Sequence, residues 1–313
     1  MKTDFISECT EISQMDLLPT NPVVSVLMIT YNHERFLAEA IEGIVKQVAD
    51  FPFEIIIGED CSTDKTRQIA LSYQKKHPNL IRVLYSERNI GPNKNVARVM
   101  SHCRGQYIAI CEGDDFWIDV KKLQIQVGFL EASPDYVVTH HGNIQIDSEG
   151  MIVDDNIIHP EINEYSNDTL VMGGFMQPLN MCFRNVIKEF PDEYYKVLSA
   201  DSFLITLLGA FGKAKYLDNI IPSAYRIQQG GLWQGLSQDE KNIASTVTNF
   251  WISVYYKNID KEKYSSLYGE RSIEKLITSI NLKDKILIKL VVKHQLPLFY
   301  KLMRIIKKFY PNK

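Results

Sequence analysis

Three acidic residues stand close together after an apolar segment of the chain. Glu112, Asp114 and Asp115 directly follow the apolar run 107–111. Carboxylates this close would repel one another without a cation. Hard oxygen ligands favour Mg²⁺ or Mn²⁺, and an ion held by one or two carboxylates completes its shell with water and substrate phosphates. The cluster therefore predicts a divalent cation site for a substrate that carries a diphosphate.

Two further polar groups follow apolar segments in the same way. Glu59 and Asp60 come after the run 53–57, and Thr30-Tyr31-Asn32 ends the run that begins at Val23. In parallel α/β sheets, ligands bind beyond the carboxyl ends of the strands. Asp and Ser also cap helices and form turns, and that structural explanation would suffice for a single acidic pair. Two acidic groups at two strand ends favour a nucleotide-diphosphate site.

The elements that would position these residues alternate along the chain. Short links in a β-α-β-α-β-α-β order predict a doubly wound α/β domain, with a mostly parallel sheet flanked by helices. Beyond residue 117 the pattern is looser and mixed, and from residue 238 onward it is helical. Strands are expected at 23–31, 53–57, 80–85, 107–111, 136–139 and within 214–225, and helices at 34–47, 62–77, 93–103, 120–131 and 199–210.

At these residues the sequence resembles family 2 of the inverting, nucleotide-sugar-dependent glycosyltransferases with the GT-A (Rossmann-like) fold. Residues 22–32 are similar to the opening strand of that family, and residues 54–64 resemble its Asp-Asp-Gly-Ser-Thr-Asp loop. Glu112-Gly113-Asp114 stands where the family has its Asp-any-Asp motif. The residues 115–117 that follow, with 122–123, are similar to the subgroup that builds bacterial surface polysaccharides. The resemblance covers about residues 22–235.

The resemblance implies a role for each candidate residue. Asp201, which opens an apolar helix, would be the catalytic base that takes the proton of the acceptor hydroxyl, although its position alone indicates a helix cap. A Mn²⁺ or Mg²⁺ ion on Asp114 and Asp115 would neutralise the leaving diphosphate. A lid over the acceptor would include Tyr225, Arg226, Gln228 and Trp233. The donor, expected to be a UDP-sugar, would be bound by Thr30, Tyr31, Asn32, Glu59, Asp60, Arg98, Glu112 and Asp114.

The sequence departs from the family pattern at several positions. Cys61 replaces a glycine, Glu59 and Glu112 replace aspartates, and Gln228 lies where relatives often carry a histidine. A neutral glutamine can donate a hydrogen bond to phosphate but is a poor metal ligand. We therefore expect the metal affinity to differ from the family norm.

Composition and charge limit the class of protein to which the chain can belong. Its 313 residues are 45% hydrophobic with a formal net charge of −3, which is typical of a globular protein and too balanced for nucleic-acid binding. Five cysteines without paired spacing, no signal sequence and no apolar span predict a cytoplasmic protein. The expected domains are an N-terminal extension at 1–21, a GT-A domain at 22–235 with a nucleotide-binding half at 22–117 and an acceptor half at 118–235, and a helical extension at 236–313.

The end of the helical extension is basic. Residues 283–313 contain nine basic residues and one acid, and they place apolar and basic side chains on opposite faces of a helix. This layout predicts an interfacial helix that makes peripheral contact with the inner face of the cell membrane. An amphipathic helix that packs on the domain with its lysines in solvent explains the pattern equally well.

Together these features predict a metal-dependent inverting glycosyltransferase. It would move a sugar from a UDP-sugar to a hydroxyl of a glycan or lipid-linked saccharide during synthesis of a bacterial capsule, lipopolysaccharide or related polysaccharide. A sugar-phosphate nucleotidyltransferase is an alternative, but it usually needs an early glycine-rich loop, and residues 30–35 contain no glycine. A second alternative is a catalytically weak carbohydrate-binding or assembly protein of the same fold.

Overall fold

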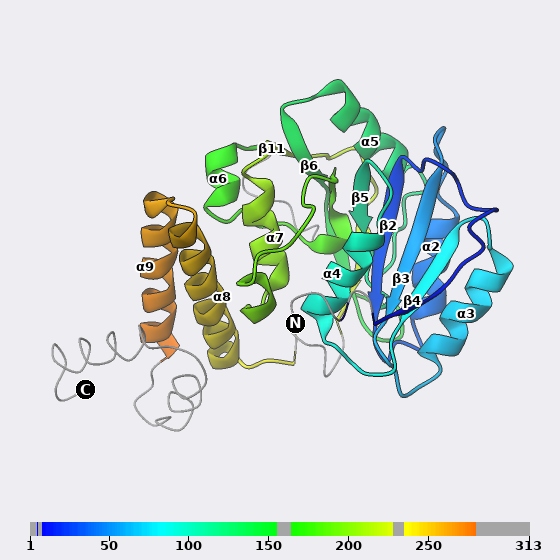
Figure 1. Ribbon diagram of the computed structural model, residues 1–313, viewed down its shortest axis with the longest axis horizontal. Coiled ribbons are helices and arrows are strands. Elements are labelled where there is room, and N and C mark those ends of the chain that lie inside the picture. Colours follow the sequence, from blue (N-terminus) through cyan, green and yellow to red (C-terminus); the bar gives the residue numbers. More distant parts are fainter. Residues whose placement is uncertain (1–4, 6–7, 155–163, 228–234, 280–313) are drawn as a thin grey trace.

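A nine-stranded sheet runs through the computed structural model, which describes residues 5, 8–154, 164–227 and 235–279 (Figure 1). The strand order is β1-β4-β3-β2-β5-β10-β6-β11-β9. Helices cover both faces of this sheet. The predicted α/β class, with a parallel centre flanked by helices, is confirmed.

The centre of the sheet consists of four parallel strands in the order β4-β3-β2-β5. Apolar side chains alternate between two cores, so that Leu27 and Ile56 face one layer of helices while Val26 and Ile55 face the other. Burial on both faces explains the continuous apolar runs in the sequence. The strands and the helices that link them are β2 (Val24–Thr30), α2 (Leu37–Val45), β3 (Phe53–Glu59), α3 (Thr66–Lys76), β4 (Ile81–Tyr85), α4 (Pro92–His102) and β5 (Tyr107–Ile110).

The same sheet continues into the second half of the chain. Strand β10 (Cys182–Arg184) lies between β5 and β6 (Tyr136–His140) and is antiparallel to both. The predicted nucleotide-binding half and the predicted acceptor half therefore contribute strands to one sheet. The other elements of this half are α5 (Lys122–Ala132), β9 (Glu164–Tyr165), α6 (Asn167–Val171), the short helices η1 (Pro178–Asn180) and η2 (Tyr194–Lys196), α7 (Ala200–Leu208) and β11 (Lys213–Tyr216).

A second, three-stranded sheet has the order β12-β7-β8. Its strands are β7 (Asn143–Ile146), β8 (Ile152–Asp154) and β12 (Ser223–Arg226). No strand is predicted from the sequence between residues 140 and 168, whereas the structure has β7, β8 and β9 there. These strands are two to four residues long, which is too short for an alternating pattern to be evident.

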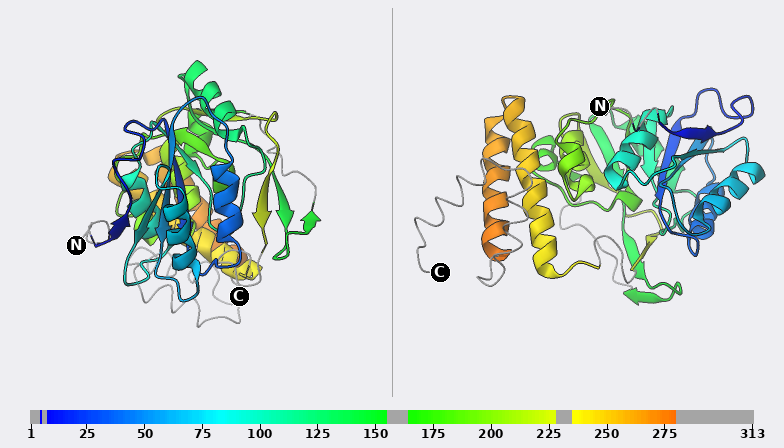
Figure 2. Two further views of the ribbon diagram at one scale, coloured as in Figure 1. Left: turned by 90° about the vertical axis from the view of Figure 1, so that its right-hand side faces the viewer. Right: turned by 60° about the horizontal axis from the view of Figure 1, so that its bottom comes forward.

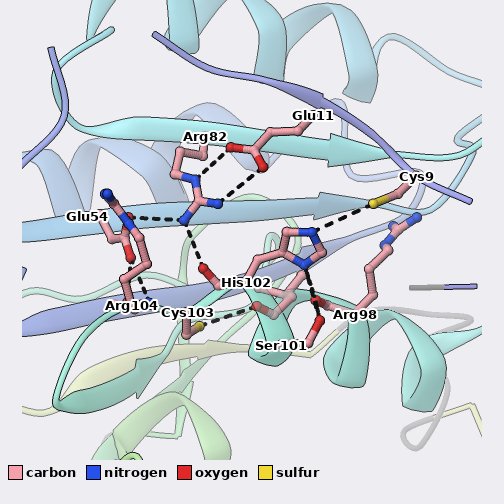
Figure 3. Close-up of polar contacts among 11 residues, drawn as sticks. Cys9, Glu11, Glu54, Arg82, Arg98, Ser101, His102, Cys103 and Arg104 are labelled. Atoms are coloured by element: carbon pink, nitrogen blue, oxygen red, sulfur yellow. Dashed lines mark hydrogen bonds and ion pairs between the residues drawn. The ribbon is translucent and has the colours of Figure 1, made fainter. Parts of the chain in front are cut away.

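The N-terminal segment adds an edge strand to the large sheet. Strand β1 (Thr10–Ile12) pairs antiparallel with β4, and Figure 3 shows how side chains fix this pairing. Glu11 accepts a hydrogen bond from Arg82 Nε at 2.8 Å. The same guanidinium donates to the buried carboxylate of Glu54 at 3.2 Å, and Arg104 donates to Glu54 from the other side. Strand β1 thus belongs to the large sheet, although it lies within the predicted N-terminal extension 1–21.

Two long helices at the C-terminal end of the described chain form an antiparallel pair. Helices α8 (Gln238–Asn258) and α9 (Glu262–Ser279) lie at the opposite end of the molecule from α3 (Figure 2). Tyr256 and Tyr268 attach them to the domain by donating hydrogen bonds to the carbonyl oxygens of Thr206 and Val171. The predicted helical extension is observed to residue 279, and the basic segment 283–313 lies outside the described residues. Within the part that is described, no helix has the length and apolar character needed to cross a membrane.

Candidate functional site

The polar groups predicted at three strand ends converge at one edge of the large sheet. Strand β2 lies between β3 and β5. Just beyond it, the backbone N–H of Asp60 donates to the carbonyl oxygen of Thr30 at 3.1 Å, and that of Gly113 donates to Ile29 at 3.0 Å. Asp60 and the acidic loop 112–115 therefore flank the end of β2. This is the edge at which parallel α/β sheets bind ligands.

The acidic loop gathers three carboxylates. One ligand oxygen from each of Glu112, Asp114 and Asp115 lies within 4.8 Å of the others. Burial, helped by the charges of Asp114 and Asp201, raises the pKa of Glu112 to about 8. Burial and the same kind of repulsion raise the pKa of Asp115 well above its usual range. Closely spaced oxygen donors that repel one another fit a hard divalent cation.

The acidic loop is held in place by Arg226 of β12. The backbone N–H of Arg226 donates to Asp115 Oδ1 at 2.7 Å, and its Nε donates to the carbonyl oxygen of Asp114 at 2.9 Å. Its Nη2 reaches Glu39 at 2.6 Å, and the Arg226 side chain is only 2% exposed. Arg226 was expected to line the lid or acceptor site. Its guanidinium is buried and occupied by protein partners, and a role of Arg226 in the lid stays a prediction.

Asp201 lies in the first turn of α7. Ser199 occupies the N-cap position and its side chain makes no capping hydrogen bond, so Asp201 is not the N-cap that its position in the sequence suggests. Burial raises the pKa of Asp201, and the nearby backbone N–H groups of Ser202 and Asp201 oppose this rise. The charge of Asp201 also raises the pKa of Glu112. The structure therefore brings the predicted base within electrostatic range of the acidic loop.

On the other side of β2, Asp60 organises the loop that precedes α4. Its two carboxylate oxygens accept hydrogen bonds from the backbone N–H groups of Ile90 and Gly91, both at 2.9 Å. Burial raises its pKa. Between the two acidic groups, Tyr31 is 43% exposed. Asn32 joins two strand-end loops by accepting a hydrogen bond from the Thr63 N–H at 2.8 Å.

Two predicted donor-binding residues lie beneath this surface. The carboxylate of Glu59 has no exposed area and pairs with Arg67 Nε at 2.6 Å. Arg98 is also fully buried, and its Nη2 donates to the Glu59 carbonyl oxygen at 3.0 Å and to Asn95 Oδ1 at 2.6 Å. Glu59 and Arg98 therefore support the loop that carries Asp60, and their direct contact with a donor stays a prediction.

The predicted lid is described only in part. Tyr225 of β12 is partly buried and packs against the core on the α2 side of the sheet. Gln228 and Trp233 lie outside the described residues. Their expected contacts with an acceptor, and the effect of a glutamine at position 228, stay predictions.

One residue that the sequence analysis missed lies beside the acidic loop. His33 Nε2 is 3.8 Å from Asp114 Oδ2. The residue follows Thr30-Tyr31-Asn32 directly, and a histidine in that position next to a strand end was the signal available in the sequence.

Comparison with known proteins agrees with this geometry. Residues 25–190 match the family model described as Glycosyl transferase family 2. An uncharacterized protein of Mycobacterium tuberculosis strain H37Rv is 32% identical over 225 residues, which is 71% of this chain and 64% of that protein. The chain thus spans less than two thirds of the length of this relative.

A glycosyltransferase of Staphylococcus aureus is similar in both sequence and structure. The poly(ribitol-phosphate) β-N-acetylglucosaminyltransferase TarS of strain Mu50 is 31% identical over 124 residues, which is 38% of this chain and 20% of that enzyme. The crystal structure of its residues 1–349 in complex with UDP-GlcNAc matches with a TM-score of 0.60 and 20% identity, covering 84% of this chain and 76% of that one.

A mannosyltransferase of Pyrobaculum calidifontis in complex with GDP-Man and Mn²⁺ has the same fold. It matches with a TM-score of 0.56 and 15% identity over 94% of this chain and 81% of that one. Together with the match to TarS, this likeness identifies the fold as that of the GT-A glycosyltransferases.

Proposed function

This chain belongs to glycosyl transferase family 2, and from that membership we propose that it transfers a sugar from a UDP-sugar to a hydroxyl of a glycan or lipid-linked saccharide, with inversion at the anomeric carbon. The product would be part of a bacterial surface polysaccharide. The choice of a uridine nucleotide is supported by the similarity to TarS, whose structure contains UDP-GlcNAc.

The observation that carries the proposal is the position of Asp201 relative to the acidic loop. The loop lies beyond β5 at the ligand-binding edge of the sheet, and the charge of Asp201 acts on Glu112 across the site. Transfer of a sugar requires assistance both to the diphosphate that leaves and to the hydroxyl that attacks. One acidic group can assist the departing diphosphate, and the other can activate the incoming hydroxyl.

The acidic loop fits a Mn²⁺ or Mg²⁺ ion, with Asp114 and Asp115 as the proposed ligands and Glu112 beside them. Such an ion, when bound, acts as a Lewis acid toward the charge that develops on the diphosphate. The contribution of the protein is to hold these carboxylates in place. Arg226 does so by donating to the backbone of Asp114 and to the side chain of Asp115.

Asp201 is proposed to accept the proton of the attacking hydroxyl. A carboxylate within hydrogen-bond reach of a hydroxyl contributes roughly 10² to 10⁴ in rate. The side chain of Asp201 is partly exposed at the start of α7, so an acceptor could reach it. The N–H groups of the first turn of the helix stabilise its charged form.

The function is tested by donor turnover. The full chain would be incubated with UDP-glucose, UDP-galactose and their N-acetyl forms, each with and without Mn²⁺, and the release of UDP would be measured. We expect release that depends on Mn²⁺ and strongly favours one donor. Pyrophosphate release from UTP and a sugar 1-phosphate would instead identify a nucleotidyltransferase. Failure to bind UDP or to release it from any donor would favour the non-catalytic alternative.

We also propose that residues 283–313 make peripheral contact with an anionic membrane. The support for this is the sequence alone, since nine basic residues and one acid accompany an apolar helical face. Deletion of 283–313 should abolish co-sedimentation with anionic liposomes while UDP binding is retained. If the intact chain ignores such liposomes, packing of the segment on the domain is the better account.

A further inference from the structure

The backbone of His33 is fixed from both sides. Its N–H donates to Thr66 Oγ1 at the start of α3, at 2.8 Å. Its carbonyl oxygen accepts hydrogen bonds from the N–H groups of Phe36 at 3.0 Å and Leu37 at 2.9 Å, where α2 begins. Two helices thus determine where the His33 side chain starts. These contacts fix the direction of the Cα–Cβ bond of His33.

The ring of His33 lies against the acidic loop. A Cβ atom added at Gly113 would be 3.0 Å from His33 Nδ1 and 2.6 Å from Thr30 Oγ1, so glycine is needed there for the close approach of these two side chains. On the other edge of the ring, Nε2 faces Asp114 Oδ2 at 3.8 Å. The imidazole therefore lies between the Thr30 side of Gly113 and the Asp114 carboxylate.

Two polar atoms in this arrangement lack partners. His33 Nδ1 and Thr30 Oγ1 are both buried, and neither has a hydrogen-bond partner among the residues that the structure describes. Buried polar atoms are rarely left unpaired in proteins, and an exception calls for an explanation. Here both atoms lie next to Gly113. The other ring nitrogen of His33, Nε2, faces Asp114.

We propose that Thr30, His33 and Asp114 form a line of side chains in which His33 is a positioning residue for Asp114. In the metal-bound protein the Thr30 hydroxyl would donate to Nδ1, which would leave the proton on Nε2, and Nε2–H would donate to Asp114 Oδ2; neither bond is formed in the structure. This hydrogen bond would hold the Asp114 carboxylate in a fixed orientation, with its other oxygen as the one that would bind a cation. The inference rests on the proposed function, because it concerns the metal affinity of the same site.

The arrangement needs side-chain movement at both contacts of the ring. A separation of 3.8 Å is too long for a hydrogen bond, and a shift of about 1 Å would bring the two atoms within range. Groups that orient metal ligands in this way commonly change metal affinity by 10- to 100-fold when they are removed. Replacement of His33 should therefore weaken cation binding and leave the stability of the fold unchanged.

The test is a Mn²⁺ titration of the full chain followed by the EPR signal of free Mn²⁺, which requires no turnover. We expect His33→Phe to raise the Mn²⁺ dissociation constant about 10- to 100-fold. His33→Gln should restore most of the affinity, because its amide nitrogen can take the place of Nε2. Thr30→Val should weaken binding by a smaller factor. His77→Phe, at the opposite end of α3, is the matched control and should bind Mn²⁺ as the wild type does.

A double variant separates this role from a general effect on folding. In the Asp114→Asn background, His33→Phe should cause no further loss, because the carboxylate that it orients is gone. Equal losses in both backgrounds, or wild-type affinity in His33→Phe, would overturn the inference. A nitrogen bound directly to Mn²⁺ in the pulsed EPR spectrum of the wild type would also overturn it, since His33 would then be a ligand. Absence of Mn²⁺ binding by the wild-type chain would refute the proposed metal site as well.

Discussion

Arg226 and Asp115 join the two sheets of the protein at the acidic loop. The Arg226 N–H donates to Asp115 Oδ1 at 2.7 Å, while the Arg226 side chain spans from the Asp114 carbonyl oxygen to that of Asp147. The loop that carries the proposed metal ligands is thus attached to β12 of the smaller sheet. Anything that displaces β12 should also displace the loop.

Replacement of Arg226 by Met should therefore affect stability and metal binding together. The side chain is 2% exposed, and its removal leaves buried carbonyl oxygens without donors, so we expect a loss of about 2–4 kcal/mol in the free energy of unfolding. Mn²⁺ affinity should fall at the same time. Chemical denaturation and Mn²⁺ titration measure the two effects.

Arg35 offers a matched control for Arg226. It also pairs with a glutamate, Glu149, but both side chains are more than half exposed. Such a pair contributes at most about 1 kcal/mol, so Arg35→Met should leave stability and Mn²⁺ binding nearly unchanged. Equal effects of the two substitutions would contradict the special role of Arg226.

Lys122 should make the stability of the protein depend on pH in the alkaline range. Its ammonium group is fully buried, donates to Gln126 Oε1 at 2.6 Å and lies 4.1 Å from the centre of the Trp117 ring. Burial lowers the pKa of Lys122 to about 8, whereas the unfolded chain has a value near 10.4. Between these values the unfolded state binds more protons, so the free energy of unfolding rises with pH.

A Lys122→Met variant isolates this effect. Denaturation of both proteins between pH 7 and pH 10 should show the wild type gaining up to about 3 kcal/mol relative to the variant as the pH rises. The neighbouring thiols of Cys111 and Cys182 have pKa values raised by burial in the folded state; they ionise in the unfolded chain of both proteins, so their effect cancels in the difference. A difference that stays constant over the range would show that Lys122 keeps its proton at pH 10.

Two glycines provide opposite tests of the packing. A Cβ at Gly58 in β3 would meet Val99 Cγ2 at 2.4 Å and Asn95 Oδ1 at 2.5 Å, where α4 packs on the strand. Gly58→Ala should lower the free energy of unfolding by about 1–3 kcal/mol. Gly128 in α5 has no such neighbour within 4 Å, and Gly128→Ala should raise the stability by about 0.5–1 kcal/mol. Thermal denaturation of the two variants measures both changes. A more stable Gly58→Ala or a less stable Gly128→Ala would contradict the predictions.

The sequence predicted the central strands and the acidic loop because their signals are local. A buried parallel strand appears as a continuous apolar run, and the loop that follows it can be read from the polar residues at its end. Strand β1 was missed because it is a three-residue edge strand whose side chains are mostly exposed. Its pairing depends on a salt bridge between Glu11 and Arg82, 71 positions apart, which no local pattern reveals.

The sequence did not reveal which side chains of the site face outward. Glu59 and Asp60 are adjacent at the end of β3, yet Glu59 points to Arg67 below the surface while Asp60 holds the Ile90 and Gly91 amides. Depth below the surface is decided by the strands and helices that pack around a residue. His33 was overlooked, although it directly follows Asn32, because the sequence does not show that its ring lies beside Asp114.

The most direct test of the proposed site compares Asp114→Asn with Asp201→Asn. Both variants should lose transfer, Asp201→Asn by roughly 10² to 10⁴ through loss of the base. Calorimetric titration with UDP should then separate them, because only Asp114→Asn removes the Mn²⁺-dependent part of UDP binding. Wild-type turnover in either variant, or loss of UDP binding in Asp201→Asn alone, would contradict the assignment of metal and base to these two residues.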